Sequence, residues 1–191
     1  MFTAAFLSAV NHVMLYEVGS NFKLTDSVRK GLIDTLQNRK ACGYTNDPVD
    51  PGGETKFGIA KNANLNVDVT RLTWDQAINI YYDKYWLAGS CDKLPSRVAA
   101  LHFDACVNNG ISRANKMLQA AIGVTQDGDI GPITIQQVSK MNDIVLCEKL
   151  CDARLSFYKN IVSNNPSQVK YINGWTRRVE EMRTFVKTAK F

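Results

Sequence analysis

The sequence lacks the features that mark fibrous, disordered or repetitive proteins. It has only five prolines among 191 residues, and it contains no low-complexity tract and no internal repeat. Apolar residues make up 45% of the chain and charged residues 21%, as in ordinary globular proteins. These absences indicate a globular protein. Its length fits one compact domain, or two small lobes, because domains usually contain about 100–200 residues.

Cysteine and histidine are also scarce, and their spacing disfavours several kinds of site. The chain has five cysteines and two histidines, with no Cys-x-x-Cys pair and no His-rich cluster. Five cysteines cannot all pair within one chain, and Cys147 and Cys151, four apart in a predicted helix, are typical of small buried apolar residues. We therefore expect free thiols, no metal and no cofactor, and we interpret His12 and His102 as structural.

The N-terminal segment lacks the marks of an export signal or a membrane anchor. Residues 1–15 are partly apolar, but no basic residues precede them, and Asn11 and His12 interrupt them. We therefore expect no stable insertion into a membrane.

Positive charge is in modest excess, with a net charge of +5, and it gathers late in the chain. The basic residues there are Arg177, Arg178, Arg183, Lys187 and Lys190. A polyanionic partner such as an anionic bacterial wall fits this pattern, and so does an ordinary solvated helix face. We expect no nucleic acid as partner, because no helix-turn-helix, zinc finger or aromatic–basic alternation is present.

What the sequence does contain is helical periodicity. Apolar residues at helical spacing predict a first helix that ends near Glu17, ahead of Gly19, and a second helix over Lys23–Lys40. Further helices are predicted after Thr73, from Pro95, over Ser112–Ile122, through Ile133 and Val138, over Asn142–Ile161 and over Gly174–Lys190. We expect a mainly α protein with about eight helices and at most one small β-ribbon, near Tyr44 to Ile59.

Residues 42–58 differ from this pattern, because Gly, Pro and Asp form consecutive turns there. A loop of this composition more often carries a binding or catalytic site than a core segment does. It contributes Asp47 and Asp50, while Glu17 ends the preceding helix. These carboxylates are candidates for the pair that hydrolysis of a glycosidic bond needs, an acid that protonates the leaving oxygen and a second carboxylate.

The order of motifs carries more information than any single residue. Tyr16-Glu17-Val18-Gly19 is followed later by Gly43-Tyr44, Asn46-Asp47-Pro48, Asp50, Gly52-Gly53, Thr55 and Gly58-Ile59. This order resembles the signature of glycoside hydrolase family 108, in which both parts are continuous. Here about two dozen residues, including the Lys23–Lys40 helix, separate the parts. We assign the acid to Glu17, since the residues before it match the family's leading helix, and we interpret the rival Glu54 as a surface residue.

Later segments extend the resemblance to nearly the whole chain. Residues 103–110 and 124–132 resemble the family's predicted peptidoglycan-binding region, and Gly174-Trp175 through Val179 is similar to its closing helix. The resemblance implies one lysozyme-like domain over residues 1–191, with a catalytic lobe at 1–95 and a helical lobe at 96–191.

The resemblance, with a looser likeness to phage lysozymes, also implies the roles of the site residues. Glu17 is the acid, Asp50 supports the developing charge, and Thr55 holds the attacking water. Asp47 is the alternative second carboxylate, and substrate contacts are expected from Asp47, Tyr44, Asn108 and Asn109. Asn108 and Asn109 are equally suited to capping a helix.

The implied activity is that of a phage endolysin, a monomer that hydrolyses the β-1,4 bond between N-acetylmuramic acid and N-acetylglucosamine in bacterial peptidoglycan. A lytic transglycosylase, and a non-catalytic wall-binding or secretion-accessory protein, are the alternatives. The same resemblance implies that the protein stays in the host cytoplasm until lysis and then reaches the periplasm and cell wall through a holin pore.

Overall fold

The computed structural model describes residues 1–191, which form two compact units. The smaller unit comprises residues 10–83, and the larger, helical unit comprises residues 1–9 and 84–191. The division falls within the first helix, α1 (Ala4–Glu17). Our lobe boundary after residue 95 is a functional division and stays a prediction.

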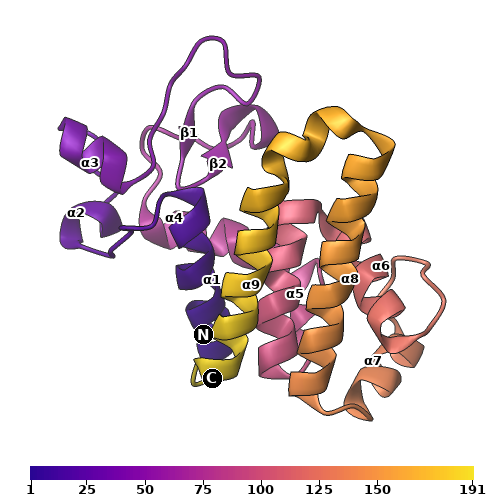
Figure 1. Ribbon diagram of the computed structural model, residues 1–191. Coiled ribbons are helices and arrows are strands. Elements are labelled where there is room, and N and C mark those ends of the chain that lie inside the picture. The colour runs from indigo at the N-terminus through magenta and orange to yellow at the C-terminus, as the bar shows by residue number, and fades with distance from the viewer. The chain divides into compact units, whose positions relative to one another are not determined.

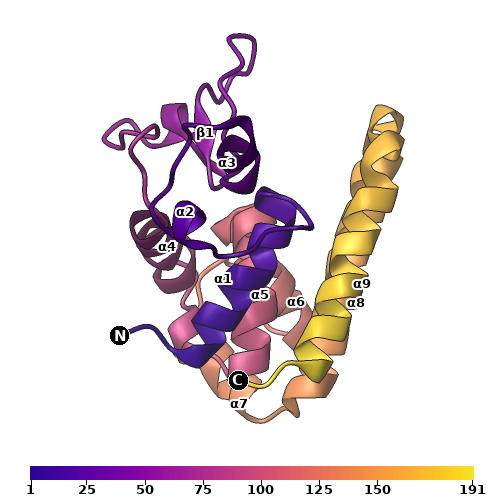
Figure 2. The same cartoon turned by 90° about the vertical axis from the view of Figure 1, so that its left-hand side faces the viewer.

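The helical unit is built from five helices: α5 (Ser96–Asn109), α6 (Ile111–Ile122), α7 (Pro132–Ser139), α8 (Asp143–Asn164) and α9 (Ile172–Thr188). The last two form a long hairpin, seen from two sides in Figures 1 and 2, that packs on α5. Two short 3₁₀ helices complete the unit, η3 (Cys91–Lys93) before α5 and η4 (Pro166–Tyr171) at the hairpin turn. Its core is apolar and includes Val98, Leu101, Phe103, Leu118, Leu146, Leu150, Val179 and Met182.

One ionic network crosses this core. Asp104 on α5 is fully buried and lies 2.5 Å from a guanidinium nitrogen of Arg154 on α8 and 2.8 Å from one of Arg178 on α9. Burial alone would raise the pKa of Asp104, but the two guanidinium groups outweigh it and lower that pKa. The carboxylate therefore ties three helices together as an anion.

The smaller unit contains the end of α1, two short helices α2 (Asp26–Arg29) and α3 (Leu36–Ala41), and α4 (Trp74–Tyr81). Strands β1 (Thr55–Lys56) and β2 (Ile59–Ala60) form an antiparallel ribbon, followed by the 3₁₀ helix η1 (Lys61–Ala63). A π-helical segment, η2 (Tyr82–Leu87), follows α4. The expected mainly α fold with one small ribbon is confirmed, with nine α-helices in place of about eight. No helix in the chain has both the length and the apolar character to span a bilayer.

The predicted helix over Lys23–Lys40 is wrong, because the chain breaks it into α2 and α3 (Figure 1). Gly31 lies between them with a φ of +66°, and a Cβ there would come within 2.2 Å of the Leu72 carbonyl oxygen. The buried Lys56 ammonium donates to the Gly31 carbonyl at 2.6 Å and to that of Thr70 at 2.8 Å. These distant contacts fix a turn where local periodicity favours a helix.

The basic residues near the C-terminus do not form a free positive face. Arg178 is held by the buried Asp104, and Arg183 contacts Glu148, Asp152 and Glu180. Lys187 also pairs with Glu148, at 2.5 Å. Much of the charge that suggested an anionic partner is therefore neutralised inside the helical unit.

Candidate active site

Glu17 is the last residue of α1, and it lies against the turn of the β-ribbon. A Cβ placed on Gly58 would be 2.9 Å from the Glu17 Cβ and 2.6 Å from the Tyr81 hydroxyl oxygen. Real Cβ contacts are longer than this, so only glycine allows the turn to come so close. The Glu17 side chain is half-buried there.

The ribbon turn itself is held in an unusual conformation. Phe57 and Gly58 are the two loop residues between β1 and β2, with φ angles of +53° and +72°. Two successive positive φ angles are typical of a type I′ hairpin turn, which normally prefers Asn or Gly at the first position. Phe57 adopts it because its ring is buried beside Trp74, at 5.7 Å, and its carbonyl accepts a 2.9 Å hydrogen bond from Tyr81.

Residues 20–42, which we call the insertion, separate the two halves of the motif, and the two ends of this segment lie side by side. Gly43 has a φ of +60°, and a Cβ there would lie 3.2 Å from the Cα of Val18. The chain therefore leaves after Val18 and returns beside it at Gly43, which brings Tyr44 and the following loop back to the end of α1. A pocket of about 370 Å³ opens between the two ends of the insertion, lined by Val18, Gly19, Ser20, Asn21, Phe22, Lys40 and Ala41.

Asp47 and Asp50 are both exposed and both shape the loop. The Asp47 carboxylate accepts a 3.0 Å hydrogen bond from the Val49 amide, and the Asp50 carboxylate accepts one of 2.7 Å from the Gly52 amide. Such bonds from a side chain to the amide two residues on are a common way to stabilise turns. The two aspartates are therefore held alike, and the preference for Asp50 stays a prediction.

Thr55 begins the strand that leads to the Glu17 contact. Its backbone forms a bridge with Thr45 through two hydrogen bonds of 2.9 Å. Its hydroxyl, which is half-buried, donates to the Gly53 carbonyl at 3.3 Å. The loop that carries Asp47 and Asp50 is thus closed at the residue predicted to hold water.

Tyr44 and Glu54 form a pair that we did not predict from the sequence. The Tyr44 hydroxyl donates to Glu54 at 2.6 Å, and the Lys61 ammonium lies 3.9 Å from the other carboxylate oxygen. The hydrogen bond to Glu54 is the main reason why the pKa of Tyr44 is raised, and burial is the second reason. The interpretation of Glu54 as a surface residue is wrong, since its side chain is only 10% exposed. Both partners hold the Glu54 carboxylate inside the smaller unit.

Asn108 and Asn109 lie in the helical unit, at the end of α5. The Tyr158 hydroxyl lies 2.7 Å from the Asn108 amide oxygen and 3.1 Å from the Asn109 amide nitrogen. Arg154 also donates to Asn108, at 3.1 Å. The two amides thus join α5 to α8. Asn109 also lines a pocket of about 430 Å³ with Arg113 and Lys116, which suits a polar ligand, and substrate contact there stays a prediction.

Three side chains of types that bind metals lie close together, although we predicted no metal site from the sequence. Cys91, His102 and Cys106 are all buried in the helical unit. His102 and Cys106 are four residues apart and therefore share one face of α5. This spacing was a sequence signal for a metal site, and we missed it because we looked for a Cys-x-x-Cys pair.

Comparisons with known proteins agree with the features of both units. The glycosyl hydrolase 108 family model matches residues 39–110, and the model of a predicted peptidoglycan domain matches residues 113–180. The solved structure of SagA from Brucella abortus is 30% identical with a TM-score of 0.69, covering 95% of this chain and 93% of SagA. A search of curated proteins finds no match.

Together, the fold and these matches define a glycosidase that acts on peptidoglycan. The chain belongs to the glycosyl hydrolase 108 family and carries a peptidoglycan-binding domain in its later helices, which confirms the family that the motifs predicted. The family match begins at residue 39, after Glu17, so the role of Glu17 as the acid stays a prediction.

Proposed function

We propose that this glycosidase is a muramidase that hydrolyses the β-1,4 bond between N-acetylmuramic acid and N-acetylglucosamine, with Glu17 as its acid. The observation that carries the proposal is the close approach of Gly58 to Glu17. It supports the proposal because the ribbon next to the carboxylic acid is the one that carries Thr55 and follows the Asp47–Asp50 loop.

Each residue has a defined part in the proposed reaction. Glu17 protonates the leaving glycosidic oxygen from its half-buried position beside the turn of the ribbon. Asp50 stabilises the positive charge that develops on the sugar ring, with Asp47 as the alternative. Thr55 positions the attacking water through its hydroxyl. The pocket beside Val18 lies one residue beyond the acid and offers room for part of the glycan.

A lytic transglycosylase is the main alternative, because it needs the same acid but no water. The second carboxylate and Thr55 favour hydrolysis, since neither is needed to form an anhydro sugar. Mass spectrometry of digested sacculi separates the two reactions: the proposal expects reducing-end muropeptides, and anhydro-muramyl products would overturn it.

The substitution Glu17→Gln tests the acid directly. We expect it to lower the rate of glycan cleavage by about 10²–10⁴-fold, the usual contribution of a general acid, while leaving binding to sacculi unchanged. Glu54→Gln is the matched control, a carboxyl in the same unit that is already held by Tyr44 and Lys61. If Glu54→Gln abolishes cleavage and Glu17→Gln does not, the acid is Glu54 and the assignment fails.

We further propose that the protein serves as an endolysin, a monomer that waits in the host cytoplasm and passes a holin pore to the periplasm and wall. The five free, buried cysteines support synthesis in a reducing compartment. Expression in a bacterial host with and without a holin tests this role. We expect lysis only when both are present, and lysis without the holin would contradict this route of export.

A further inference from the structure

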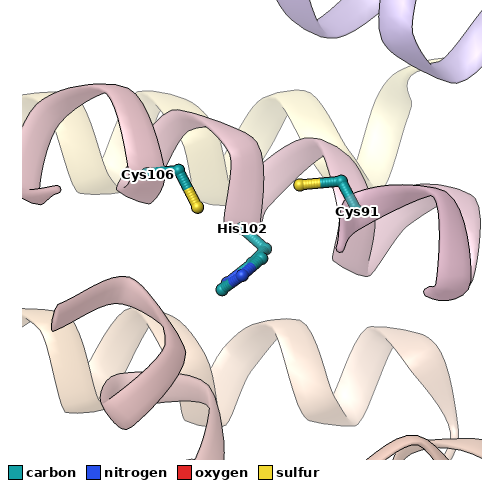
Figure 3. Close-up of side chains that lie close together, drawn as sticks. All are labelled: Cys91, His102 and Cys106. Atoms are coloured by element: carbon teal, nitrogen blue, oxygen red, sulfur yellow. The ribbon is translucent and has the colours of Figure 1, made fainter. Parts of the chain in front are cut away.

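A group of three buried side chains in the helical unit takes no part in the proposed reaction. Cys91 begins η3, while His102 and Cys106 lie one turn apart on α5. All three residues are fully buried, and their ligand-type atoms lie within 4.8 Å of one another. In Figure 3 the side chains of Cys91 and Cys106 converge, and the His102 imidazole lies below both sulfurs in this view.

The hydrogen bonds of His102 determine which ring nitrogen is free to bind a metal. Its Nε2 lies 3.0 Å from the Asn115 amide oxygen and 3.2 Å from the Gly89 carbonyl oxygen. The Asn115 amide nitrogen donates to the Gly128 carbonyl at 2.9 Å, which orients its oxygen toward the ring. Two acceptors require a hydrogen on Nε2, so the neutral ring has its lone pair on Nδ1. That Nδ1 is buried and has no hydrogen-bond partner.

This arrangement matches the way histidines bind metals in proteins. A ligating histidine typically donates its other N–H to a carbonyl or amide oxygen, which fixes the ring and its tautomer. In tetrahedral zinc sites the Zn–S and Zn–N distances of about 2.3 and 2.0–2.1 Å place neighbouring ligand atoms about 3.5–3.8 Å apart. The 4.8 Å limit on the three atoms here includes that spacing.

The backbone before Cys91 is shaped to bring its sulfur close to Cys106. A Cβ on Gly89 would lie 2.7 Å from the Cys106 sulfur and 2.6 Å from the Tyr85 carbonyl oxygen, so only glycine fits there. The next residue, Ser90, has a φ of +54°, in a region that non-glycine residues seldom adopt. Backbone strain of this kind clusters at functional sites.

We propose that Cys91, His102 and Cys106 form a structural zinc site in the helical unit. The Cys91 and Cys106 sulfurs and His102 Nδ1 supply three ligands, and water or a nearby carbonyl completes the coordination. Zinc displaces the thiol protons into solvent, so the ligands are two thiolates and one neutral imidazole. The metal fixes the turn at residues 89–93 to α5. It is independent of the proposed muramidase reaction.

A cysteine–histidine nucleophile is the other chemistry that these residue types suggest. Hydrogen bonding from Cys91 lowers the pKa of the Cys106 thiol to about 5, as a nucleophile would require. Full burial of both Cys106 and His102 excludes a substrate from them, however. The geometry therefore favours a small ion over a reaction partner.

Metal analysis of the full-length wild-type protein is the first test. The protein is reduced, loaded with Zn²⁺, desalted and analysed by mass spectrometry for metal content, with one zinc per chain expected. Co²⁺ in place of zinc should give the strong visible bands of a tetrahedral site and a sulfur-to-metal charge-transfer band. Zinc should also raise the melting temperature by about 5–15 °C, as expected for a tightly bound ligand.

Variants then assign the ligands. Cys91→Ser, Cys106→Ser and His102→Gln should each lose the stoichiometric metal and the cobalt charge-transfer band. Cys147→Ser is the matched control, because Cys147 is also buried but lies on α8 beside Cys151. If Cys147→Ser alone loses the metal, or the reduced wild type binds none, the proposal is overturned. The wild-type cobalt spectrum decides the question even if a ligand variant fails to fold.

A disulfide between Cys91 and Cys106 is the remaining competitor. Five reactive thiols in denatured protein purified without reductant would support the metal site. Three thiols, with a disulfide-linked peptide pair carrying Cys91 and Cys106, would overturn it. Both readouts are independent of glycan cleavage, so failure of the zinc site and failure of the muramidase proposal are distinguishable.

Discussion

The two units of the protein use charged side chains in opposite ways. In the helical unit, Asp104, Arg154 and Arg178 are buried and join three helices in one ionic network. In the smaller unit, Asp47 and Asp50 are exposed, and each supports a turn through a single hydrogen bond. Charge in the first unit holds the fold together, whereas charge in the second stays available for chemistry. The difference predicts which substitutions affect stability and which affect activity.

The largest effect is expected at Asp104. Asp104→Asn leaves the buried Arg154 without its anion and should lower the free energy of unfolding by about 3–5 kcal/mol. Asp50→Asn, in the exposed loop, should change it by less than about 0.5 kcal/mol while reducing activity. Urea unfolding of both variants measures the contrast, and equal losses would remove the distinction between the two units.

The free energy of unfolding measured at acidic pH gives an independent check on Asp104. The folded-state pKa of Asp104 is lower than its ordinary value of 3.8. Its contribution to stability is therefore complete above that value and is lost as the pH falls through the lower folded-state pKa. The Asp104→Asn variant should lack this part of the acid dependence, and Asp50→Asn should retain it.

A smaller effect is expected at Gly58, where we compare two glycines with similar backbone angles, one in each unit. Gly58→Ala adds a Cβ within 2.9 Å of Glu17 at a φ of +72°, and should cost about 2–3 kcal/mol and most of the activity. Gly123 is the matched control, with a φ of +74° and no atom within 4 Å. Gly123→Ala should cost only about 1 kcal/mol and leave activity intact. Thermal unfolding and glycan cleavage are measured on both, and equal activity losses would mean that the Glu17 contact is unimportant.

The smallest effect is expected at Lys56, the exception to the comparison. It is the fully buried charged residue of the smaller unit, and burial lowers the pKa of its ammonium group. Lys56→Met leaves the Gly31 and Thr70 carbonyls without their donor and should cost about 1–2 kcal/mol. Hydrogen exchange should then increase mainly in residues 26–41. Uniform exchange across the chain would show that Lys56 does not anchor the insertion.

Local sequence predicted most of the fold, because its evidence lies within single elements. The end of α1 at Glu17 and the ribbon near Thr55 follow from periodicity and turn residues. The break in the Lys23–Lys40 helix does not, since it depends on Leu72, about forty residues beyond Gly31. The pairing of Arg178 with Asp104 spans 74 residues, and no local pattern distinguishes it from an exposed basic helix.

The candidate site also depends on contacts between residues far apart in the sequence, which local patterns do not predict. Family motifs predicted roles for Glu17, the aspartates and Thr55, which stay predictions, but they left Glu54 as a surface residue, because its burial depends on Tyr44 and Lys61. They also left Cys91, His102 and Cys106 as separate residues, because only the packing of η3 on α5 brings them together. Long-range contact, rather than residue type, separates what the sequence predicts from what it does not.

The meeting of Gly43 with Val18 gives the insertion a modular character. A segment whose two ends touch can be varied at its exposed tips without moving the residues on either side. Evolution can therefore reshape the pocket beside Val18 by varying the exposed parts of this segment. Removing the whole segment would instead leave the buried Lys56 ammonium without the Gly31 carbonyl that accepts its hydrogen bond.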